Sequence, residues 1–353
     1  MAINVGYRMT AAPPFDAMRA AVAAEAATGA ASFWWPDHLL SFHVPELWDD
    51  RHRDAADLHR YLDPFVCMQA CAESAGSALI GVSVTDGIRR MPATLAQTAL
   101  SLDHLAPGRV VLGLGAGEVA NYVPYGWGVS SPADRLEAAA AAIRAHFDGP
   151  GPDEAGAMMG LRPAPGSPGP QLWLGAHGPR GLAVTGRYAD GWLPYLLDVD
   201  EWHAARALVQ TAALEAGRDP GRITTGLQVN AVLADDHAAA HAMLEHPAVR
   251  ALALLFPDRW YRAGGWEHPL GGSGLHSLIA TRLGPALRTA ADAIPAALVH
   301  DRIPHGTPDE IAVHVRRHEG VEHVRLADYS MVAGTVEAES SRALRVETAR
   351  LLH

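Results

Sequence analysis

Apolar residues fall into short runs that alternate with longer, Ala-rich amphipathic segments. The runs are continuous rather than alternating with polar residues, which is typical of parallel strands buried on both faces. They predict strands over 3–8, 31–35, 78–84, 109–114, 171–175, 191–194, 224–233 and 321–326. Helices are predicted between them, for example over 15–28, 93–105, 179–188 and 200–216. Pro and Gly at many of the boundaries support these limits.

This alternation indicates either a closed barrel or a doubly wound sheet. Gly113, Gly115 and Gly117 are spaced by two, which is a weak match to the dinucleotide-binding pattern of doubly wound folds. We therefore predict an α/β fold, a (β/α)8 TIM barrel, as a single domain over 1–353. Segments at about 39–62, 149–170 and 257–305 do not fit the repeating pattern and are predicted to be insertions.

Composition and charge exclude several classes of function. The net charge is −11, and nucleic-acid binding needs a basic surface. All 28 basic residues are Arg, so a lysine Schiff base and a phosphate-binding loop lysine are excluded. Cys67 and Cys71, four residues apart, predict two buried thiols on one helix face. Without a basic leader or a long apolar segment, we expect a cytoplasmic protein with no membrane span, acting on a small molecule.

Polar and small residues follow four consecutive predicted strands. Asp37-His38 follows the second strand, 83–86 ends the third, 115–118 follows the fourth and 176–179 the fifth. On a barrel these strand ends share one face, where active sites of this fold lie. Small residues there allow a ligand to approach the backbone, and free N–H groups at a helix start near Pro179 can bind an anion.

A metal centre is not expected. The chain has 19 histidines, but neither H-E-x-x-H nor C-x-x-C spacing was found. His43, His52 and His59 lie in a predicted loop without metal-type spacing.

Six motifs in order along the chain carry a resemblance to a known family. The chain resembles the bacterial luciferase-like superfamily, in particular its branch that uses the deazaflavin coenzyme F420, and is similar to phthiodiolone-type ketoreductases. The motifs are Trp-Pro-Asp-His-Leu at 35–39, Val-Thr-Asp-Gly-Ile-Arg-Arg at 84–90, Gly-Glu at 117–118 followed by Pro-Tyr-Gly at 124–126, Ala-His-Gly-Pro-Arg at 176–180, His-Pro-Leu-Gly at 268–271 and Gly-Thr-Pro-Asp-Glu at 306–310.

The resemblance implies roles for individual residues. His38 would be the catalytic acid/base, Glu118 a second catalytic group, and Asp37 a contact of the deazaflavin ring. Ser83-Val84 matches a non-prolyl cis peptide behind the ring. The substrate pocket would include Trp35, Phe42 and Tyr125, and a homodimer is expected. The cofactor-binding residues would be Asp37, Ser83, Val84, Thr85, Ala116, Gly117, Glu118, Asn121, Ala176, His177, Gly178 and Pro179.

Departures from the family narrow the expected activity. The sugar-phosphate dehydrogenases of the superfamily use a Glu after the first strand and lysines, which this chain lacks, and Phe42 stands where they have Trp. The expected activity is that of an F420-dependent reductase. It would transfer a hydride between deazaflavin C5 and a carbonyl or alkene carbon of a bulky, largely apolar substrate, with His38 moving the proton. The alternatives are an FMN-dependent monooxygenase and a non-catalytic flavin-binding protein.

Overall fold

The computed structural model describes residues 2–40, 47, 60–127, 131–149, 156–271, 285–330 and 338–353. No helix in these ranges is both long and apolar enough to span a bilayer. The insertion expected at 39–62 lies mostly outside them. The described part of the excursion expected at 149–170 contains neither helix nor strand from 156 onward, as its Gly and Pro content predicts.

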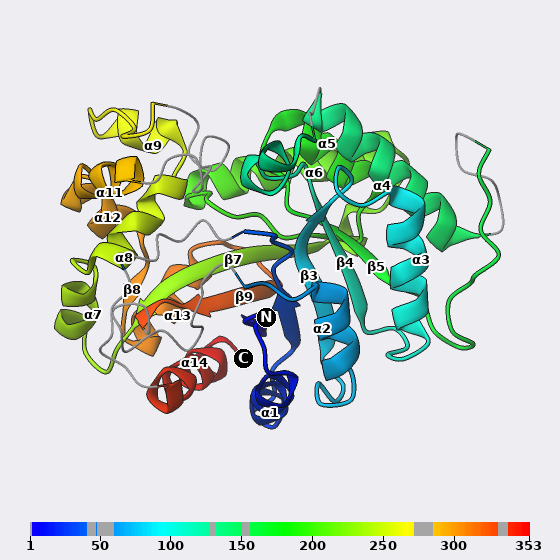
Figure 1. Cartoon of the computed structure of the whole chain (residues 1–353), viewed down its shortest axis with the longest axis horizontal. Helices are drawn as coiled ribbons and strands as arrows, with labels where there is room; N and C mark the ends of the chain where they lie inside the picture. Colours follow the sequence, from blue (N-terminus) through cyan, green and yellow to red (C-terminus); the bar gives the residue numbers. More distant parts are fainter. Residues whose placement is uncertain are drawn as a thin grey trace.

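Eight parallel strands close into a barrel, as predicted (Figure 1). Hydrogen-bonded pairs run from β1 through β6, and β6–β7, β7–β9 and β9–β1 complete the ring. A short strand, β8 (His305–Gly306), pairs with the far end of β7 outside this ring. The barrel strands are β1 (Asn4–Arg8), β2 (Ser32–Trp35), β3 (Leu79–Asp86), β4 (Val110–Gly115), β5 (Gln171–Leu174), β6 (Gly191–Trp192), β7 (Thr224–Leu233) and β9 (His323–Asp328).

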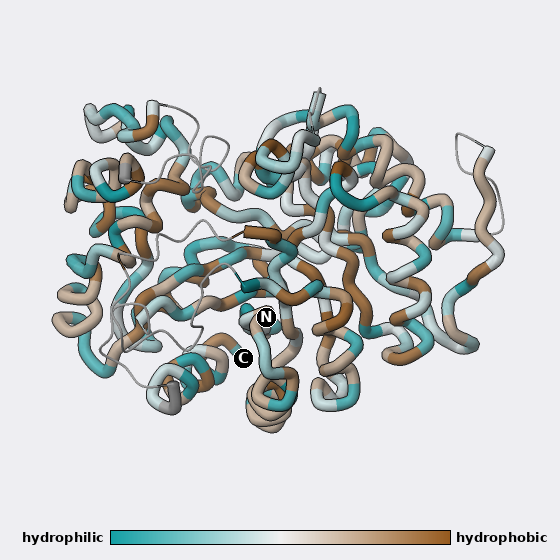
Figure 2. The backbone as a smooth tube through the Cα atoms, in the orientation of Figure 1, coloured by the Kyte–Doolittle hydropathy of each residue, from teal (hydrophilic) through white to brown (hydrophobic). Residues whose placement is uncertain are grey.

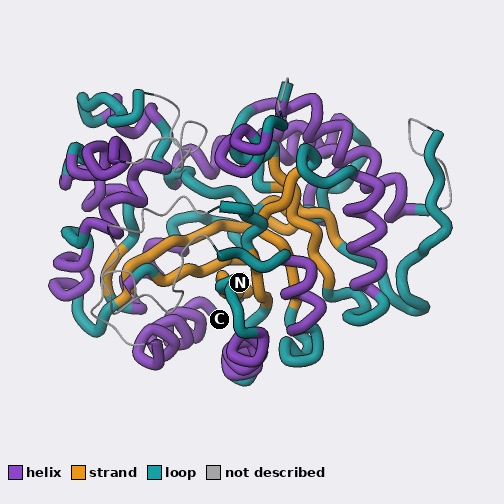
Figure 3. The backbone as a smooth tube through the Cα atoms, in the orientation of Figure 1, coloured by secondary structure: helices purple, strands orange, loops and turns teal. Residues whose placement is uncertain are grey.

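Helices surround the barrel, so that the strands lie inside a helical layer (Figure 3). The last helix lies at the amino-terminal end of the first strand, where the N–H of Ile3 donates to the carbonyl of Leu352 over 3.1 Å. The surrounding helices are α1 (Phe15–Ala26), α2 (Pro64–Cys71), α3 (Pro92–Asp103), α4 (Pro132–Asp148), α5 (Pro179–Tyr188), α6 (Val199–Glu215), α13 (Pro308–Arg316) and α14 (Ala338–Leu352).

Between β7 and β9 the chain leaves the simple repeat and builds a helical insertion. Its helices gather on one side of the barrel, at the left in Figure 1. They pack on one another through an apolar cluster of their own that includes Leu254, Tyr261 and Val299. The insertion contains α7 (His237–Met243), α8 (Pro247–Arg250), η6 (Ala251–Leu255), α9 (Asp258–Ala263), α11 (Pro285–Asp292) and α12 (Ala296–Arg302).

Local sequence explains where the helices begin. Asp198 caps α6 and Thr307 caps α13, each in a reciprocal capping box with the Glu three residues later. Asp63 accepts hydrogen bonds from the first N–H groups of α2, where Pro64 occupies the first helical position. Cys67 and Cys71 are free and buried on α2, which confirms their predicted state.

Successive residues of β2 face opposite sides of the barrel wall. Trp34 points into the barrel, where it packs with Val111, Trp173 and Leu193. Trp35, on the other face, belongs to the main core between strands and helices. Glycine makes room inside, because a Cβ at Gly81 would lie 2.6 Å from the Trp34 ring. Brown, hydrophobic segments recur along the barrel strands in Figure 2.

Candidate active site

A cavity of about 310 Å³ lies at the carboxyl ends of the barrel strands. The loops after β2, β3, β4 and β5 supply most of its wall, and residues of the helical insertion cover one side. Nine of the twelve residues that the resemblance assigned to cofactor binding line it. They are Asp37, Ser83, Val84, Thr85, Ala116, Gly117, Glu118, Asn121 and His177.

Asp37 is buried and held by cations. Arg90 donates to both of its carboxylate oxygens, over 2.9 and 3.0 Å, and the Thr85 hydroxyl donates over 2.6 Å. Arg89 forms an ion pair with it at 3.1 Å. Burial raises the pKa of Asp37, but the Arg90 hydrogen bond and the charges of both arginines outweigh it, so the pKa lies below its ordinary value. Asp37 is therefore an ionised anchor for the loop after β3.

Arg89 and Arg90 are accordingly part of the site's framework rather than a solvated loop. Arg89 is almost fully buried and pairs with Asp86 at 2.7 Å as well as with Asp37. Arg90 bridges Asp37 to Asp63, the cap of α2, over 2.8 Å. The acidic residues that hold them are Asp37 after β2, Asp63 before α2 and Asp86 at the end of β3.

Asn121 connects the two predicted catalytic residues. Its side chain is buried, and its Oδ1 accepts the backbone N–H of Leu39 over 2.7 Å, which fixes the orientation of the amide. Its Nδ2 then donates to Glu118 Oε2 over 2.9 Å and to His38 Nδ1 over 3.0 Å. A His38 ring that accepts at Nδ1 carries its proton on Nε2 when neutral.

Glu118 and His38 form an ion pair once the imidazole is protonated. Glu118 Oε2 lies 3.2 Å from His38 Nδ1. Burial raises the pKa of Glu118, but the His38 charge, the His38 hydrogen bond and Arg89 lower it below the ordinary value. Glu118 lines the cavity; His38 is not among the described residues that do so, although it contacts both Glu118 and Asn121. The pair can thus store a proton at the cavity wall.

Val84 forms the apolar floor of the cavity. The Ser83–Val84 peptide bond is cis, as the resemblance predicted, and the β3–β4 register shifts there. Val84 fits against β4 and β5 only because glycines face it. A Cβ at Gly115 would lie 2.7 Å from Val84 Cγ2, and one at Gly175 would lie 3.2 Å from Cγ1. The result is a flat wall with room for a planar ring.

One buried polar atom at the cavity has no hydrogen-bond partner within the described part of the chain. This atom is the Ser83 Oγ, and Ser83 lines the cavity. A buried hydroxyl normally has a partner. The Val84 floor, the polar rim and this hydroxyl together fit a planar heteroaromatic ring that carries hydrogen-bonding atoms on its edge.

The segment after β5 contributes less of the wall than predicted. His177 lines the cavity and accepts the backbone N–H of Tyr195 through Nε2, over 3.1 Å. Ala176, Gly178 and Pro179 are not among the cavity-lining residues of the described chain. Gly178 and Pro179 instead start α5, whose first turn has no side-chain cap. Its free N–H groups suit an anion beside the cavity.

The predicted aromatic pocket residues do not gather at this cavity. Trp35 is fully buried in the core, because its strand position faces the helices. Tyr125 is 47% exposed and stacks on Trp127 at 5.3 Å. Phe42 lies outside the described residues. Of the two tryptophans of β2, Trp34 faces the barrel interior, packed against Trp173 below the cavity.

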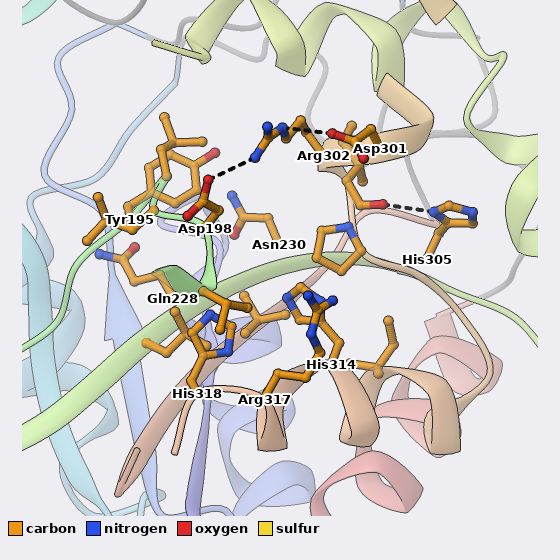
Figure 4. A pocket seen from close by; sticks show the side chains of 18 of the residues that line it. Tyr195, Asp198, Gln228, Asn230, Asp301, Arg302, His305, His314, Arg317 and His318 are labelled. Carbon is orange, nitrogen blue, oxygen red and sulfur yellow. Dashed lines mark hydrogen bonds and ion pairs between the residues drawn. The ribbon is translucent and has the colours of Figure 1, made fainter. Parts of the chain in front are cut away.

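A second cavity of about 500 Å³ adjoins the first, with Tyr195, Leu196 and Gln228 lining both. Figure 4 shows it between β7 and the helices of the insertion. Its wall mixes apolar and polar side chains, with an Arg302–Asp198 ion pair at 3.1 Å and also His314 and Arg317 among the polar ones. Sequence reasoning missed this cavity, because its residues come from segments that only the fold brings together.

Two arginines inside the barrel lack an acidic partner in the described chain. Arg8 and Arg325 come from the neighbouring strands β1 and β9, and Arg325 is only 6% exposed. Burial and the nearby Arg8 charge lower the pKa of Arg325 to about 10. Their electrostatic neighbours are the hydroxyls of Tyr195 and Tyr329. Burial raises the pKa of Tyr195, so its hydroxyl remains a hydrogen-bond donor at neutral pH.

Comparison with known proteins identifies the family. The family model for the luciferase-like monooxygenases matches residues 3–322. A phthiodiolone/phenolphthiodiolone dimycocerosates ketoreductase of Mycobacterium tuberculosis is 33% identical over 91% of this chain and 89% of its own length. An F420-dependent hydroxymycolic acid dehydrogenase of the same species is 34% identical over 59% of this chain and 57% of its own.

Solved structures share the fold at lower identity. An F420-dependent secondary alcohol dehydrogenase in complex with an F420-acetone adduct has a TM-score of 0.76, with 17% identity and full coverage of both chains. The oxygenating constituent of 3,6-diketocamphane monooxygenase from Pseudomonas putida, in complex with FMN, has a TM-score of 0.66 and 15% identity, covering 99% of this chain and 98% of its own.

Proposed function

The chain belongs to the luciferase-like monooxygenase family, and within it we propose that it is an F420-dependent oxidoreductase. It would transfer a hydride between deazaflavin C5 and a carbonyl or alkene carbon of a bulky, largely apolar substrate. The observation that carries the proposal is one cavity lined by Val84 and by Glu118 and Asn121, which form a hydrogen-bond network with His38. The 33% identity to a ketoreductase over 91% of the chain supports the same reading.

The residues that would hold the cofactor follow from the cavity wall. Val84 would support the ring face, with the Ser83 hydroxyl and the 116–118 turn at its edge. The free N–H groups at the start of α5 would hold the coenzyme phosphate, with His177 beside them. Asp37 would act mainly through the arginines, which it keeps in place along the cavity. When bound, a deazaflavin supplies a hydride at C5 and does not activate oxygen.

His38 and Glu118 would move the proton that accompanies the hydride. Nδ1 of His38 lies 3.0 Å from the Asn121 amide nitrogen and also faces the Glu118 carboxylate. Glu118 stabilises the imidazolium at 3.2 Å, and its low pKa keeps it ionised at neutral pH. An imidazole suits this role because its unperturbed pKa lies near working pH.

The substrate's carbonyl oxygen would meet hydrogen-bond donors in the barrel mouth. The Tyr195 hydroxyl stays protonated, and Tyr195 lines both cavities. The positive charges of Arg8 and Arg325 near it favour charge developing on such an oxygen. The apolar part of the substrate would extend away from this mouth. The relatives named above are, by their names, a ketoreductase of phthiodiolone and phenolphthiodiolone dimycocerosates and a dehydrogenase of hydroxymycolic acid.

A second candidate is an FMN-dependent monooxygenase on the same barrel. It is favoured by the structural neighbour that is in complex with FMN. Titration with oxidised F420 and with FMN, followed by quenching of the fluorescence of the nine tryptophans, separates the two candidates. We expect saturable F420 binding and at least about tenfold weaker FMN binding, a difference of 1.4 kcal/mol. Binding of FMN without F420 would overturn the proposal.

A further inference from the structure

Three histidines of the helical insertion converge outside the barrel. His237 and His241 lie on α7, and His305 lies on β8. One ring nitrogen from each lies within 4.8 Å of the others. We propose that these residues form a binding site for a divalent transition-metal ion of the zinc class. This inference does not depend on the function proposed above, and it replaces the expectation that the chain binds no metal.

The fold brings the three ligands together in two steps. His237 and His241 are four residues apart on one helix, the spacing at which two histidines on a helix face bind zinc in H-E-x-x-H proteins. His305 comes 64 residues after His241, and it approaches because β8 pairs with β7 at Val232. Since α7 directly follows β7, the pairing carries His305 to the helix.

Hydrogen bonds orient two of the rings for metal binding. His305 Nδ1 lies 2.8 Å from the carbonyl oxygen of Ile303, which can only accept, so Nδ1 carries the proton (the dashed line at His305 in Figure 4). His237 Nδ1 lies 3.0 Å from the Glu310 carboxylate and donates to it in the same way. Both bonds leave Nε2 unprotonated in the neutral ring, and Nε2 of His305 faces His241. A carboxylate or carbonyl behind the imidazole is typical of metal-binding histidines.

The spacing of the nitrogens also suits a tetrahedral ion. His241 Nδ1 lies 3.1 Å from His305 Nε2. Two nitrogens bound to one tetrahedral zinc at about 2.0–2.1 Å lie ~3.3 Å apart. His237 is 57% exposed, so its side chain has room to move toward the other two within the 4.8 Å that separates the ligand atoms. Metal binding requires only that the His241 proton move to Nε2, because His305 Nε2 is already unprotonated.

The charged groups around the cluster favour a cation. Glu310 lies behind His237, and Glu245 binds the neighbouring His300 at 2.8 Å. Three imidazoles without a thiolate suit Zn²⁺, Co²⁺, Ni²⁺ or Cu²⁺, with a water in the fourth position.

The bound ion would cross-link the insertion. It would join α7 to β8. It would thereby tie the carboxyl end of β7, which precedes α7, to the segment that leads into α13. A site that binds only in the folded state stabilises that state by mass action. His305 also lines the second cavity, which places the ion at its edge.

The test uses the full-length protein without a histidine tag, stripped with EDTA and given one equivalent of Zn²⁺. We expect about one zinc per chain to remain after gel filtration, measured by mass spectrometry of the metal. We also expect a rise in Tm of about 3 °C at a hundredfold excess of zinc over Kd. Co²⁺ in place of Zn²⁺ should give the visible absorption of a tetrahedral site.

The His241→Ala and His305→Ala proteins should retain no zinc and show no rise in Tm. The His237→Asn change is at the exposed ligand, so it should weaken zinc binding without affecting the fold. His104→Ala is the matched control. His104 is an exposed histidine that is hydrogen-bonded to the Arg162 carbonyl and takes no part in the cluster. It should bind zinc as the unmodified protein does. Loss of zinc on gel filtration, or equal retention by the folded His241→Ala and His305→Ala proteins, would overturn the proposal.

Discussion

Asn121 Nδ2 lies 3.0 Å from Nδ1 of His38, and Oε2 of Glu118 lies 3.2 Å from the same nitrogen. Because the backbone N–H of Leu39 fixes the amide orientation, Asn121 can only donate to the ring. Asn121 is thus a positioning residue for His38, and it holds Glu118 at the same time.

Replacing Asn121 by Ala should lower kcat by about a hundredfold, because His38 and Glu118 lose the amide that holds both side chains. The pH dependence of kcat should also change, since the His38–Glu118 pair is no longer held at 3.2 Å. Steady-state rates from pH 5 to 9 measure both effects. If KM rises while kcat and its pH dependence stay unchanged, Asn121 acts in binding alone.

Replacing Asp37 by Asn should lower the free energy of unfolding by about 3 kcal/mol, because Arg89 and Arg90 would each lose one of the two carboxylates that hold them. Urea unfolding at pH 7 measures this. The matched control is Asp134→Asn, since Asp134 pairs with Arg180 on the surface and should cost less than about 1 kcal/mol.

The Asp37 effect should depend on pH in one direction. Its pKa in the folded protein lies below 3.8, so the carboxylate contributes its stability above that value. The contribution is lost as the pH falls through the lowered folded pKa. The difference between the unmodified protein and Asp37→Asn should therefore be constant from pH 5 to 8 and shrink only in stronger acid. A difference that grows in acid would contradict this assignment.

Replacing His323 by Gln should flatten the acid dependence of stability. Burial lowers the pKa of His323 from 6.5 to about 4, so the folded protein holds this ring neutral. Between those values the unfolded chain binds one more proton than the folded protein, and stability falls as the pH decreases. The slope from one group is at most about 1.4 kcal/mol per pH unit. Urea titrations at several pH values between 4 and 7 should show this slope reduced in His323→Gln.

Replacing Gly115 by Ala should disturb the cavity floor, because the new Cβ would lie 2.7 Å from Val84 Cγ2. We expect a loss of about 1–3 kcal/mol in stability and an F420 Kd raised by about tenfold. Gly160→Ala is the control, since nothing lies within 4 Å of a Cβ there. Equal F420 affinity of the two variants would show that Val84 does not support the ring.

The barrel could be predicted because each strand is a continuous apolar run and each helix has local start signals. Asp37 and Glu118 could be placed at one face because parallel strand ends meet there, whereas Asn121 was implied by the family resemblance. The role of Asp37 could not be predicted, since it depends on how the loop that carries Arg89 and Arg90 packs. Trp35 was assigned to the pocket although its strand position faces the helices, and a four-residue strand does not reveal which face is inward.

The histidine cluster shows a different limit. The spacing of His237 and His241 was visible in the sequence and was the signal that could have been used. Their partner His305 approaches only through the pairing of a two-residue strand, β8, which has too short a pattern to predict.

The most direct test of the central claim is turnover of F420 itself. Reduced F420 is mixed without oxygen with the protein and a series of long-chain ketones, and its reoxidation is followed by absorbance. We predict reoxidation by the unmodified protein, slowed at least about a hundredfold in His38→Ala and Glu118→Gln, with F420 Kd within about threefold of the original. Turnover with reduced FMN and oxygen but not with F420, or unchanged rates in both variants, would contradict the account.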